Sequence, residues 1–495
     1  MLPFSTLIQL DRDAETAIYQ QIAHQLAGLI RDGIIQPGAR LPGSREMALL
    51  LQVHRKTVVA AYEELSAQDW TESIPRKGIM VSSRLPELKP RSFKAAQQAA
   101  PYAGNAPFAV ANQLSLPEYP LAAKPHRLVL NDGTPDSRLA PMDLLVRTYK
   151  ELLSERYFKK MAPQASFAGT AALREALALF LRDTRGLSIG TENILVTRGA
   201  QMAIYLAAQM LLRKGDYVIV SRPNYYMADK VFEQAGAQLL RIPVDDQGID
   251  VDAVEALCKK KKVRLLYIVP HHHYPTTVTL SMDRRMKLLD IIRRYQLTVV
   301  EDDYDYDFHY SSGPILPLAS AGHGGNVIYI GSLTKTLSPS IRLGYMIGTA
   351  DLIGQTTTLR RIMDIRGDML LEDAIAILIR NGDIGRHLKK SNKIYHARRD
   401  YLAGLLTDQL PDFFRFRIPD GGMAIWAHLT PTRTLSQLAL RVSEKGLRMN
   451  DGSYYFDGNE PSNSLRLGFA ALREKEMEEA VDILKTALHE KTRRK

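Results

Sequence analysis

The feature that most limits the possible folds of this 495-residue chain is an alternation of short apolar runs with helical segments in its second part. "NILVTRG" precedes the helical "AQMAIYLAAQML", and the runs "YVIVSRP", "LLYIVP", "LTVVEDDY" and "NVIYIGS" follow, each ending in polar or small residues. This alternation predicts an α/β domain with a mostly parallel sheet and helices on both faces. Functional sites in such folds gather at the carboxyl ends of the strands.

The first eighty residues show a different pattern, in which three helical segments precede two short strands. "AIYQQIAHQLAGLIRDGI" has apolar residues at helical spacing and predicts an amphipathic helix that Gly33 ends. Ser44 is in position to cap a second helix, "SREMALLL". The third helix, "HRKTVVAAYEELSAQDW", turns four side chains inward: Val58, Ala61, Tyr62 and Leu65.

Helix, helix–turn–helix and hairpin in this order predict a mostly α-helical winged helix-turn-helix domain, whose last helix enters the major groove of DNA. The last helix begins with Arg55, Lys56 and Thr57, whose side chains can form hydrogen bonds to base edges or phosphates. The hairpin "TESIPRKGIMVSS" carries Arg76 and Lys77 at its tip for backbone contacts. The alternative is a small dimerisation module. Charge does not decide between them, because residues 1–85 hold nine Lys and Arg and nine Asp and Glu.

The head also resembles a known family. "IYQQIAHQLAGLIRDGIIQPGARLPGSREMALLLQVHRKTVVAAYEEL" is similar to the winged-helix domain of GntR-type bacterial repressors, most specifically in "QPGARLPGSREMA" and "RKTVVAAYEEL". The resemblance implies DNA contacts by Arg45, Arg55, Lys56, Thr57 and the wing around Gly78. Two residues depart from the pattern. Gln52 stands where the family often has a turn glycine, which we expect to strain the turn. His54 stands where the family usually has a serine-like cap, which we expect to weaken the cap of the last helix by about 1 kcal/mol if no other group substitutes.

A segment of linker composition separates this head from the rest of the chain. Residues 84–125 are rich in Pro, Ala and Gln and lack sustained periodicity. We therefore expect a DNA-binding head at 1–83, a linker at 84–125 and a body at 126–495. We predict a cytoplasmic, nucleoid-associated protein from three observations. The chain has a single cysteine, Cys258, it has no apolar run of membrane-spanning length, and we find no export signal in it.

The stretch "GSLTKTLSPSIRLGY" places Lys335 among small and hydroxylated residues after a strand. A lysine that forms a Schiff base with pyridoxal phosphate needs a carboxylate for the pyridinium nitrogen, hydroxyls or cations for the phosphate, and an aromatic ring over the pyridine face. "VVEDDYDYDF" supplies Asp302 or Asp303 for the nitrogen and Tyr304 for the phenolic oxygen.

Other strand ends supply the remaining parts of such a site. Ser332, Thr334 and Arg342 can bind the phosphate, and Tyr225 can stack on the ring. "GAQ", which is Gly199, Ala200 and Gln201, opens a helix and offers backbone N–H groups to the same anion. Taken singly, each of these features has an ordinary explanation: Lys335 as a surface lysine, "EDDYDYD" as a solvated acidic loop, and "GAQ" as the start of a helix. Together they favour a cofactor site, because five strand ends supply five complementary roles.

Residues 128–490 resemble a fold-type I aminotransferase of class I/II, and the whole chain resembles the MocR/GabR subfamily of GntR-type regulators, through "EDDYDYDF" followed by "GSLTKTLSPSIRLGY". The resemblance implies the α/β fold of the type I pyridoxal-phosphate-dependent transferases and a homodimer. It also implies roles for particular residues: Lys335 as the lysine that binds the cofactor, Asp302 as the pyridinium partner, Tyr304 at the phenolic oxygen, Tyr225 as the stacking ring, Ser332 and Arg342 at the phosphate, and Arg466 in "SLRLGFAAL" at a substrate or effector carboxylate.

Several residues depart from that pattern. "PHHHYPTTVTL" replaces the Asn-Pro-Thr-Gly turn of the enzymes, so His272 or His273 fills the space, or the histidines form a polar loop. We predict no metal site there, since consecutive side chains point in different directions. Met227 stands where the GABA-responsive member has an effector-binding arginine, so the effector is left unnamed.

Three functions fit these observations. The first is a transcriptional regulator that binds operator DNA through the head and senses pyridoxal phosphate, an amino compound, or both through the body. The second is an active aminotransferase with an accessory head, and the third is a repressor whose body only dimerises. The head favours the regulator over the enzyme, because a metabolic enzyme needs no groove-reading helix. The retained Lys335, Asp302 and Arg342 argue against the scaffold.

Overall fold

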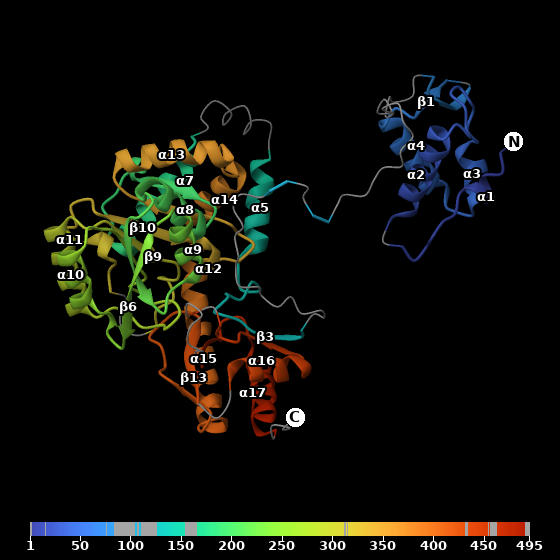
Figure 1. Cartoon of the computed structure of the whole chain (residues 1–495). Coiled ribbons are helices and arrows are strands. Elements are labelled where there is room, and N and C mark those ends of the chain that lie inside the picture. The colour runs from blue at the N-terminus through green and yellow to red at the C-terminus, as the bar shows by residue number, and fades with distance from the viewer. Residues whose placement is uncertain are drawn as a thin grey trace. The chain divides into compact units, whose positions relative to one another are not determined.

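The protein forms two compact units in a computed structural model, Met1–Ser115 and Leu116–Lys495 (Figure 1). The predicted linker, 84–125, falls outside the described residues except at four positions, and Arg76 falls outside them too. The structure describes residues 2–14, 16–75, 77–83, 104–105, 108–109, 126–153, 166–310, 313, 315–430, 434–453, 455 and 463–490.

The head is a small helical bundle with a two-stranded hairpin, as predicted. Its elements are α1 (Phe4–Leu7), α2 (Ile18–Arg31), α3 (Ser44–Leu51), α4 (Arg55–Ala67), β1 (Thr71–Ile74) and β2 (Gly78–Val81). The antiparallel strands β1 and β2 pair from Thr71 with Val81 to Ile74 with Gly78. The four side chains predicted to face inward from α4 are all buried: Val58, Ala61, Tyr62 and Leu65.

The ends of α3 and α4 differ from the sequence-based prediction. Gly43 is the N-cap of α3, so the prediction that Ser44 caps this helix is wrong; Ser44 already has helical conformation, and its Oγ accepts from Arg55 Nε at 3.3 Å. His54 does cap α4, because its Nδ1 accepts from the backbone N–H of Lys56 at 3.2 Å. Gln52 ends α3 at φ 50°, the left-handed conformation that glycine adopts at less cost.

The larger part of the body is an eight-stranded, mostly parallel sheet, which confirms the predicted fold class. The strand order is β4-β11-β10-β9-β8-β5-β6-β7; β11 runs antiparallel to both neighbours, and β7 runs antiparallel to β6. The strands are β4 (Ile194–Thr197), β5 (Tyr217–Arg222), β6 (Gln238–Asp245), β7 (Gly248–Ile249), β8 (Val263–Ile268), β9 (Val299–Asp303), β10 (Val327–Ser332) and β11 (Gly344–Ile347).

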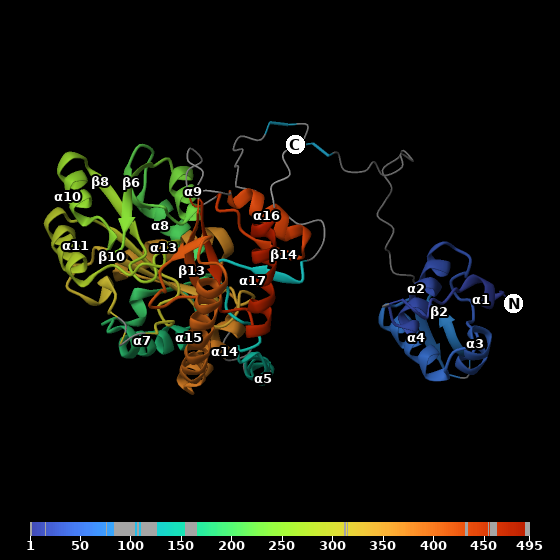
Figure 2. The same cartoon turned by 90° about the horizontal axis from the view of Figure 1, so that it is seen from below.

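Helices cover both faces of this sheet. Successive side chains of a strand point to opposite faces. On β5, Val218 and Val220 accordingly join the apolar cluster of α8 (Ala200–Leu211) and α9 (Tyr226–Gln234), whereas Ile219 joins that of α10 (Val251–Lys260) and α11 (Met282–Tyr295). Figures 1 and 2 show α10 and α11 together at one side of the sheet.

The C-terminal part of the chain forms a smaller subdomain within the body. It contains a three-stranded antiparallel sheet and a parallel pair between β3 (Leu128–Leu130) and β14 (Leu447–Met449), which carries the start of the body into this subdomain. Its helices, orange to red in Figure 2, pack beside these strands. The remaining elements here are α15 (Asp383–Gln409), β12 (Phe414–Phe416), β13 (Ala424–Leu429), α16 (Leu435–Glu444), β15 (Ser464–Gly468) and α17 (Glu474–His489).

Five further helices lie in the described part of the body. α14 contacts both α5 and α7, and the single-turn helix α12 follows β10 directly. Their bounds, with that of α13, are α5 (Met142–Leu152), α7 (Ala171–Arg185), α12 (Leu333–Thr336), α13 (Ala350–Asp364) and α14 (Met369–Arg380).

Candidate functional site

A cavity of about 290 Å³ opens where the parallel strands end. The structure brings together there residues that follow β4, β5, β8, β9 and β10, as expected for the carboxyl edge of such a sheet. Nine of the predicted cofactor residues line it: Ala200, Gln201, Tyr225, Asp302, Tyr304, Ser332, Thr334, Lys335 and Arg342. Five more residues complete the wall: Asp132, Tyr226, Tyr267, Val269 and Tyr274.

Asp302, the second-last residue of β9, lines this cavity. Its Oδ2 accepts from Tyr267 Oη at 2.7 Å, whereas its buried Oδ1 has no hydrogen-bond partner among the described residues. Burial raises the pKa of Asp302 to about 7, although the bond from Tyr267 lowers it. Asp303 lies outside the cavity wall and accepts from Tyr329 Oη at 2.8 Å. Of the two carboxylates that the sequence left open, Asp302 is the one at the cavity.

Lys335 lies in α12, and its side chain lines the same cavity. Its Nζ donates to the carbonyl of Gly133 at 2.6 Å and lies 6.0 Å from the ring centre of Tyr304. Burial, and then the charge of Arg466, lower the pKa of this amine to about 8. Roughly a tenth of the lysine is therefore neutral at pH 7, and the neutral amine is the nucleophilic form.

The end of the cavity beside Gly199 and Arg342 has the groups that hold an anion. Gly199 has φ +78° before α8, and a Cβ placed there would lie 3.2 Å from Nη2 of Arg342 and 3.6 Å from Oγ1 of Thr334. The N-terminus of α8 follows at Ala200 and adds backbone N–H groups. Ser332 Oγ accepts from the N–H of Thr334 at 3.2 Å and fixes the start of α12.

The remaining wall is aromatic. The rings of Tyr225 and Tyr274 meet edge to face at 5.3 Å, and Tyr226 lies 6.1 Å from Tyr225. Arg466, on β15, is buried behind Tyr274, with its guanidinium 4.8 Å from the ring centre. Its Nε donates to the carbonyl of Asp132 at 2.9 Å and its Nη1 to that of Pro275 at 3.0 Å. Arg466 is not among the residues that line the cavity.

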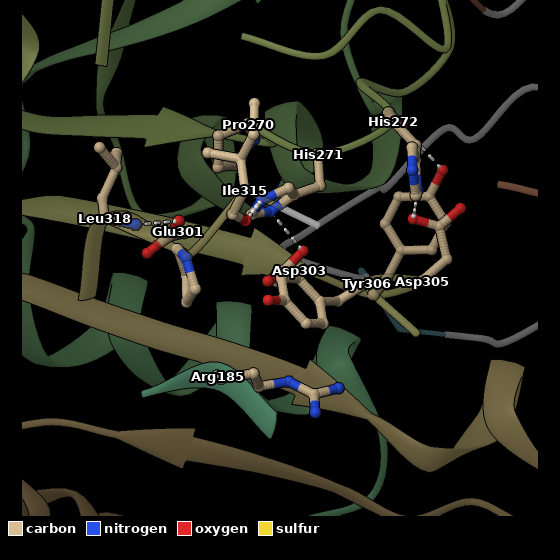
Figure 3. A network of polar contacts seen from close by, with 12 residues as sticks. Arg185, Pro270, His271, His272, Glu301, Asp303, Asp305, Tyr306, Ile315 and Leu318 are labelled. Atoms are coloured by element: carbon tan, nitrogen blue, oxygen red, sulfur yellow. Dashed lines mark hydrogen bonds and ion pairs between the residues drawn. The ribbon is translucent and has the colours of Figure 1, made fainter. Parts of the chain in front are cut away.

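The three consecutive histidines are buried and hydrogen-bonded, and none of them lines the cavity. His271 Nδ1 lies 3.1 Å from Asp303 and its Nε2 lies 2.6 Å from the carbonyl of Ile315, as Figure 3 shows. His272 Nδ1 lies 3.1 Å from Asp305. His273 pairs with the hydroxyls of Ser221 and Thr276, each at 2.8 Å. They therefore anchor the loop after β8 to its neighbours.

In the head, the residues predicted to contact DNA lie at the start of α4 and on the hairpin. Arg55 and Lys56 are exposed, and Thr57 is half-buried. Gly78 has φ +92° at the start of β2. Arg40, which the sequence pattern did not single out, is exposed, and its Nε would lie 3.5 Å from a Cβ on Gly78. The remaining residues of this prediction are Arg45, which is exposed in α3, Lys77, which is exposed in the hairpin, and Arg76, which is not described.

The cavity fits pyridoxal phosphate. The buried Oδ1 of Asp302 can accept from a pyridinium N–H, and the corner at Gly199 and Arg342 suits a phosphate. Tyr304 and Lys335 line the same cavity. Among the described residues, no group of His, Cys, Asp and Glu could hold a metal ion.

Both parts of the chain match known families. Residues 131–484 match the family described as aminotransferase class I and II, and residues 18–81 match bacterial regulatory proteins of the gntR family. The chain is 27% identical over 491 residues to the probable rhizopine catabolism regulatory protein MocR of Rhizobium meliloti, covering 97% of this chain and 96% of that protein. It is 26% identical over 468 residues to the HTH-type transcriptional regulator TauR of Rhodobacter capsulatus, covering 91% and 93%.

The similar solved structures cover the body. The α-aminoadipate aminotransferase LysN of Thermus thermophilus, complexed with N-(5'-phosphopyridoxyl)-L-leucine, matches with a TM-score of 0.68 and 26% identity, over 73% of this chain and 92% of that one. The kynurenine aminotransferase of Pyrococcus horikoshii matches with a TM-score of 0.67 and 28% identity, over 73% and 90%. Pyridoxal phosphate is therefore the cofactor that this fold and this cavity imply. No helix in the described ranges has the length and apolarity of a membrane span.

Proposed function

Since this chain belongs to the aminotransferase class I and II family and carries a gntR-family head, we propose that it is a DNA-binding transcriptional regulator. The two parts together have the organisation of the MocR-type regulators. In this proposal the body senses pyridoxal phosphate, an amino compound, or both. One observation carries this proposal. The chain matches regulators along more than nine-tenths of its length, and it keeps a cavity whose buried Asp302 oxygen suits the cofactor.

Each part of the cavity has a task in holding the cofactor. Pyridoxal phosphate, when bound, supplies an aldehyde that reacts with amines. Asp302 Oδ1 would accept from the ring nitrogen, while Tyr267 holds the other oxygen of this carboxylate. Arg342, Thr334 and the N-terminus of α8 would hold the phosphate.

The groups around Lys335 lower the pKa of its amine and orient it. Lys335 is buried, and the fall in its pKa to about 8 leaves part of the amine neutral near pH 7. The carbonyl of Gly133 orients that amine at 2.6 Å. Tyr225 is proposed to cover the ring and Tyr304 to bond its phenolic oxygen; both line the cavity.

Regulation requires that the body affects the head. We expect a homodimer, with two heads on two half-sites, in the cytoplasm of a bacterium. A ligand of the body changes DNA binding only through different affinities for two conformations of the protein. The proposed boundaries, a head at 1–83, a linker at 84–125 and a body at 126–495, leave the heads room to be repositioned.

A second candidate is transamination. Lys335 and Asp302 are both at the cavity and Arg466 lies behind it, which is the set that an aminotransferase uses. We expect any such turnover to be secondary, since both cited regulators match more than nine-tenths of this chain.

The test is a gel shift with the full chain on the DNA upstream of its own gene, with and without pyridoxal phosphate. We expect a shift that the cofactor changes. Arg55→Ala should abolish it without changing cofactor absorbance, and Lys335→Ala should remove the cofactor's effect while leaving DNA binding intact. No shift in either condition would favour the enzyme.

A further inference from the structure

The turn that joins α3 to α4 contains a residue in a strained conformation. Three residues, Gln52 to His54, separate the end of α3 at Leu51 from the start of α4 at Arg55. Gln52 has φ 50° and ψ 46°, the left-handed region, which a residue with a Cβ enters at a cost and glycine does not. Such a conformation persists where the surrounding structure favours it.

The carbonyl of Gln52 is held from a distant part of the head. It accepts a hydrogen bond from Arg12 Nη2 at 3.1 Å, across 40 positions of sequence. The ψ angle of a residue sets the direction of its carbonyl and of the chain that follows. Because the bond to Arg12 forms when the carbonyl of Gln52 points toward the guanidinium, it favours the left-handed conformation over the alternatives.

Arg12 projects from a segment that is fastened to α2. Two glutamines of α2 pair with the backbone of this segment through their side-chain amides. Gln25 accepts from the N–H of Gln9 at 2.9 Å and donates to its carbonyl at 2.6 Å. Gln21 accepts from the N–H of Asp11 at 3.0 Å and donates to its carbonyl at 2.8 Å. The guanidinium therefore has a fixed base from which to hold the turn.

The turn sets the position of the first residues of α4. The core of the head holds the rest of this helix through Val58, Ala61 and Leu65. Two residues lie between Gln52 and Arg55, so a rotation at Gln52 moves the end of α4 that is proposed to enter the major groove.

We propose that Arg12 is a positioning residue for DNA binding. It holds Gln52 in the left-handed conformation that a glycine adopts at less cost, and it so keeps the first turn of α4 in place for the major groove. This inference rests on the proposed function and deepens it by adding a residue that lies outside the helix-turn-helix. Arg12 itself needs no contact with DNA for this role.

A double-mutant cycle tests the proposal. The full chain and its Arg12→Ala variant, each with glutamine or glycine at position 52, are titrated with labelled DNA from upstream of the protein's own gene, and affinity is read from fluorescence anisotropy. The cost of a left-handed residue predicts that Arg12→Ala weakens binding by roughly 5- to 30-fold. In the Gln52→Gly background, the same change should cost no more than about twofold.

Two further variants show where the effect comes from. Gln25→Ala loosens the segment that carries Arg12, so it should reproduce part of the loss, and Gln52→Gly should again remove it. Arg31→Ala removes another exposed arginine of the head, which pairs with the adjacent Asp32 at 3.2 Å, and should bind DNA as wild type does.

Two controls accompany these titrations. Thermal melting checks that each variant folds. The salt dependence of binding should be the same in Arg12→Ala as in the wild-type chain, because no phosphate contact is lost.

Three results would overturn the inference alone. They are unchanged DNA binding in Arg12→Ala, an equal loss with and without Gln52→Gly, and a salt slope reduced by about 1, which would make Arg12 a direct phosphate contact. If the wild-type chain binds no DNA, the proposed function and this inference both fall.

Discussion

Replacing Tyr267 with phenylalanine tests how the cavity keeps Asp302 ionised. Tyr267 donates to Asp302 Oδ2 at 2.7 Å and is the partner that lowers the pKa of this carboxyl, against burial, which raises it to about 7. A hydrogen bond to a charged group is worth about 1.5–3 kcal/mol, and one pKa unit corresponds to about 1.4 kcal/mol. Losing the bond should therefore raise the pKa of Asp302 by roughly one to two units.

That change has a calculable effect on cofactor binding. The ionised fraction of Asp302 at pH 7 should fall from about one half to about 1–10%. Because an ionised carboxylate is the form that pairs with a pyridinium nitrogen, affinity for pyridoxal phosphate should fall roughly 5- to 50-fold at that pH. Raising the pH should restore it, since the carboxylate then ionises in the variant as well.

The assay is an equilibrium titration of the cofactor-free protein with pyridoxal phosphate, followed by absorbance between about pH 6 and pH 9. We expect the affinity of the wild-type protein to rise with pH through about 7, and that of Tyr267→Phe to rise at a pH higher by roughly one to two units. Tyr329→Phe is the matched control, because Tyr329 makes the same bond to Asp303, which lies outside the cavity wall. An unchanged pH midpoint in Tyr267→Phe, or an equal loss in Tyr329→Phe, would refute the reasoning.

Three other predictions follow from the same structure. Burial raises the pKa of Asp302 from 3.8 to about 7, so the folded protein loses stability as the pH rises between these values. Asp302→Asn should therefore stabilise the cofactor-free protein by up to about 4 kcal/mol above pH 7 and have little effect below about pH 4, as thermal melts at both pH values would check. The same variant should abolish cofactor binding in an absorbance titration. Lys77→Ala should weaken DNA binding to all sequences and reduce the salt slope by about 1, whereas Lys262→Ala, on the body, should leave the slope unchanged in a salt titration. His54→Ala should cost about 1 kcal/mol in chemical denaturation of the full chain, and His54→Asn, which keeps a capping acceptor, should cost less.

The parts of the fold that depend on local pattern were predictable from the sequence. The inward face of α4 follows from a spacing of three and four residues, so Val58, Ala61 and Leu65 could be identified without a structure. The cavity residues that end strands could be identified as well, because parallel strands bring their carboxyl ends to one edge. Asp302 and Lys335 are of this kind.

Residues that enter the cavity by tertiary contact were not predicted. Asp132 comes from the start of the body, and Gly133 meets Lys335 across 202 positions of sequence. Tyr267 lies within a buried strand, where a tyrosine gives no sign that its hydroxyl reaches a carboxylate. Tyr274 follows the three histidines in the loop after β8 and lines the cavity. An aromatic residue at that place, after a strand end, was a signal in the sequence that could have been used.

Burial and hydrogen-bond partners were equally hard to foresee. His271 and His272 are buried, and each is hydrogen-bonded to an aspartate of another segment, Asp303 and Asp305 respectively. The capping role expected of Ser44 was wrong because the helix begins one residue earlier than its hydroxyl suggested. Arg466 could be singled out by its motif, but the backbone carbonyls that hold it could not.

The most direct test of the account is to find which residue carries the cofactor. The full chain is incubated with pyridoxal phosphate, reduced with borohydride, digested and mapped by mass spectrometry, with Lys335→Arg as the control. The account predicts a pyridoxyl adduct on Lys335 in the wild-type chain and none on the corresponding peptide of the variant. An unmodified Lys335, or label spread over exposed lysines such as Lys259, would contradict it.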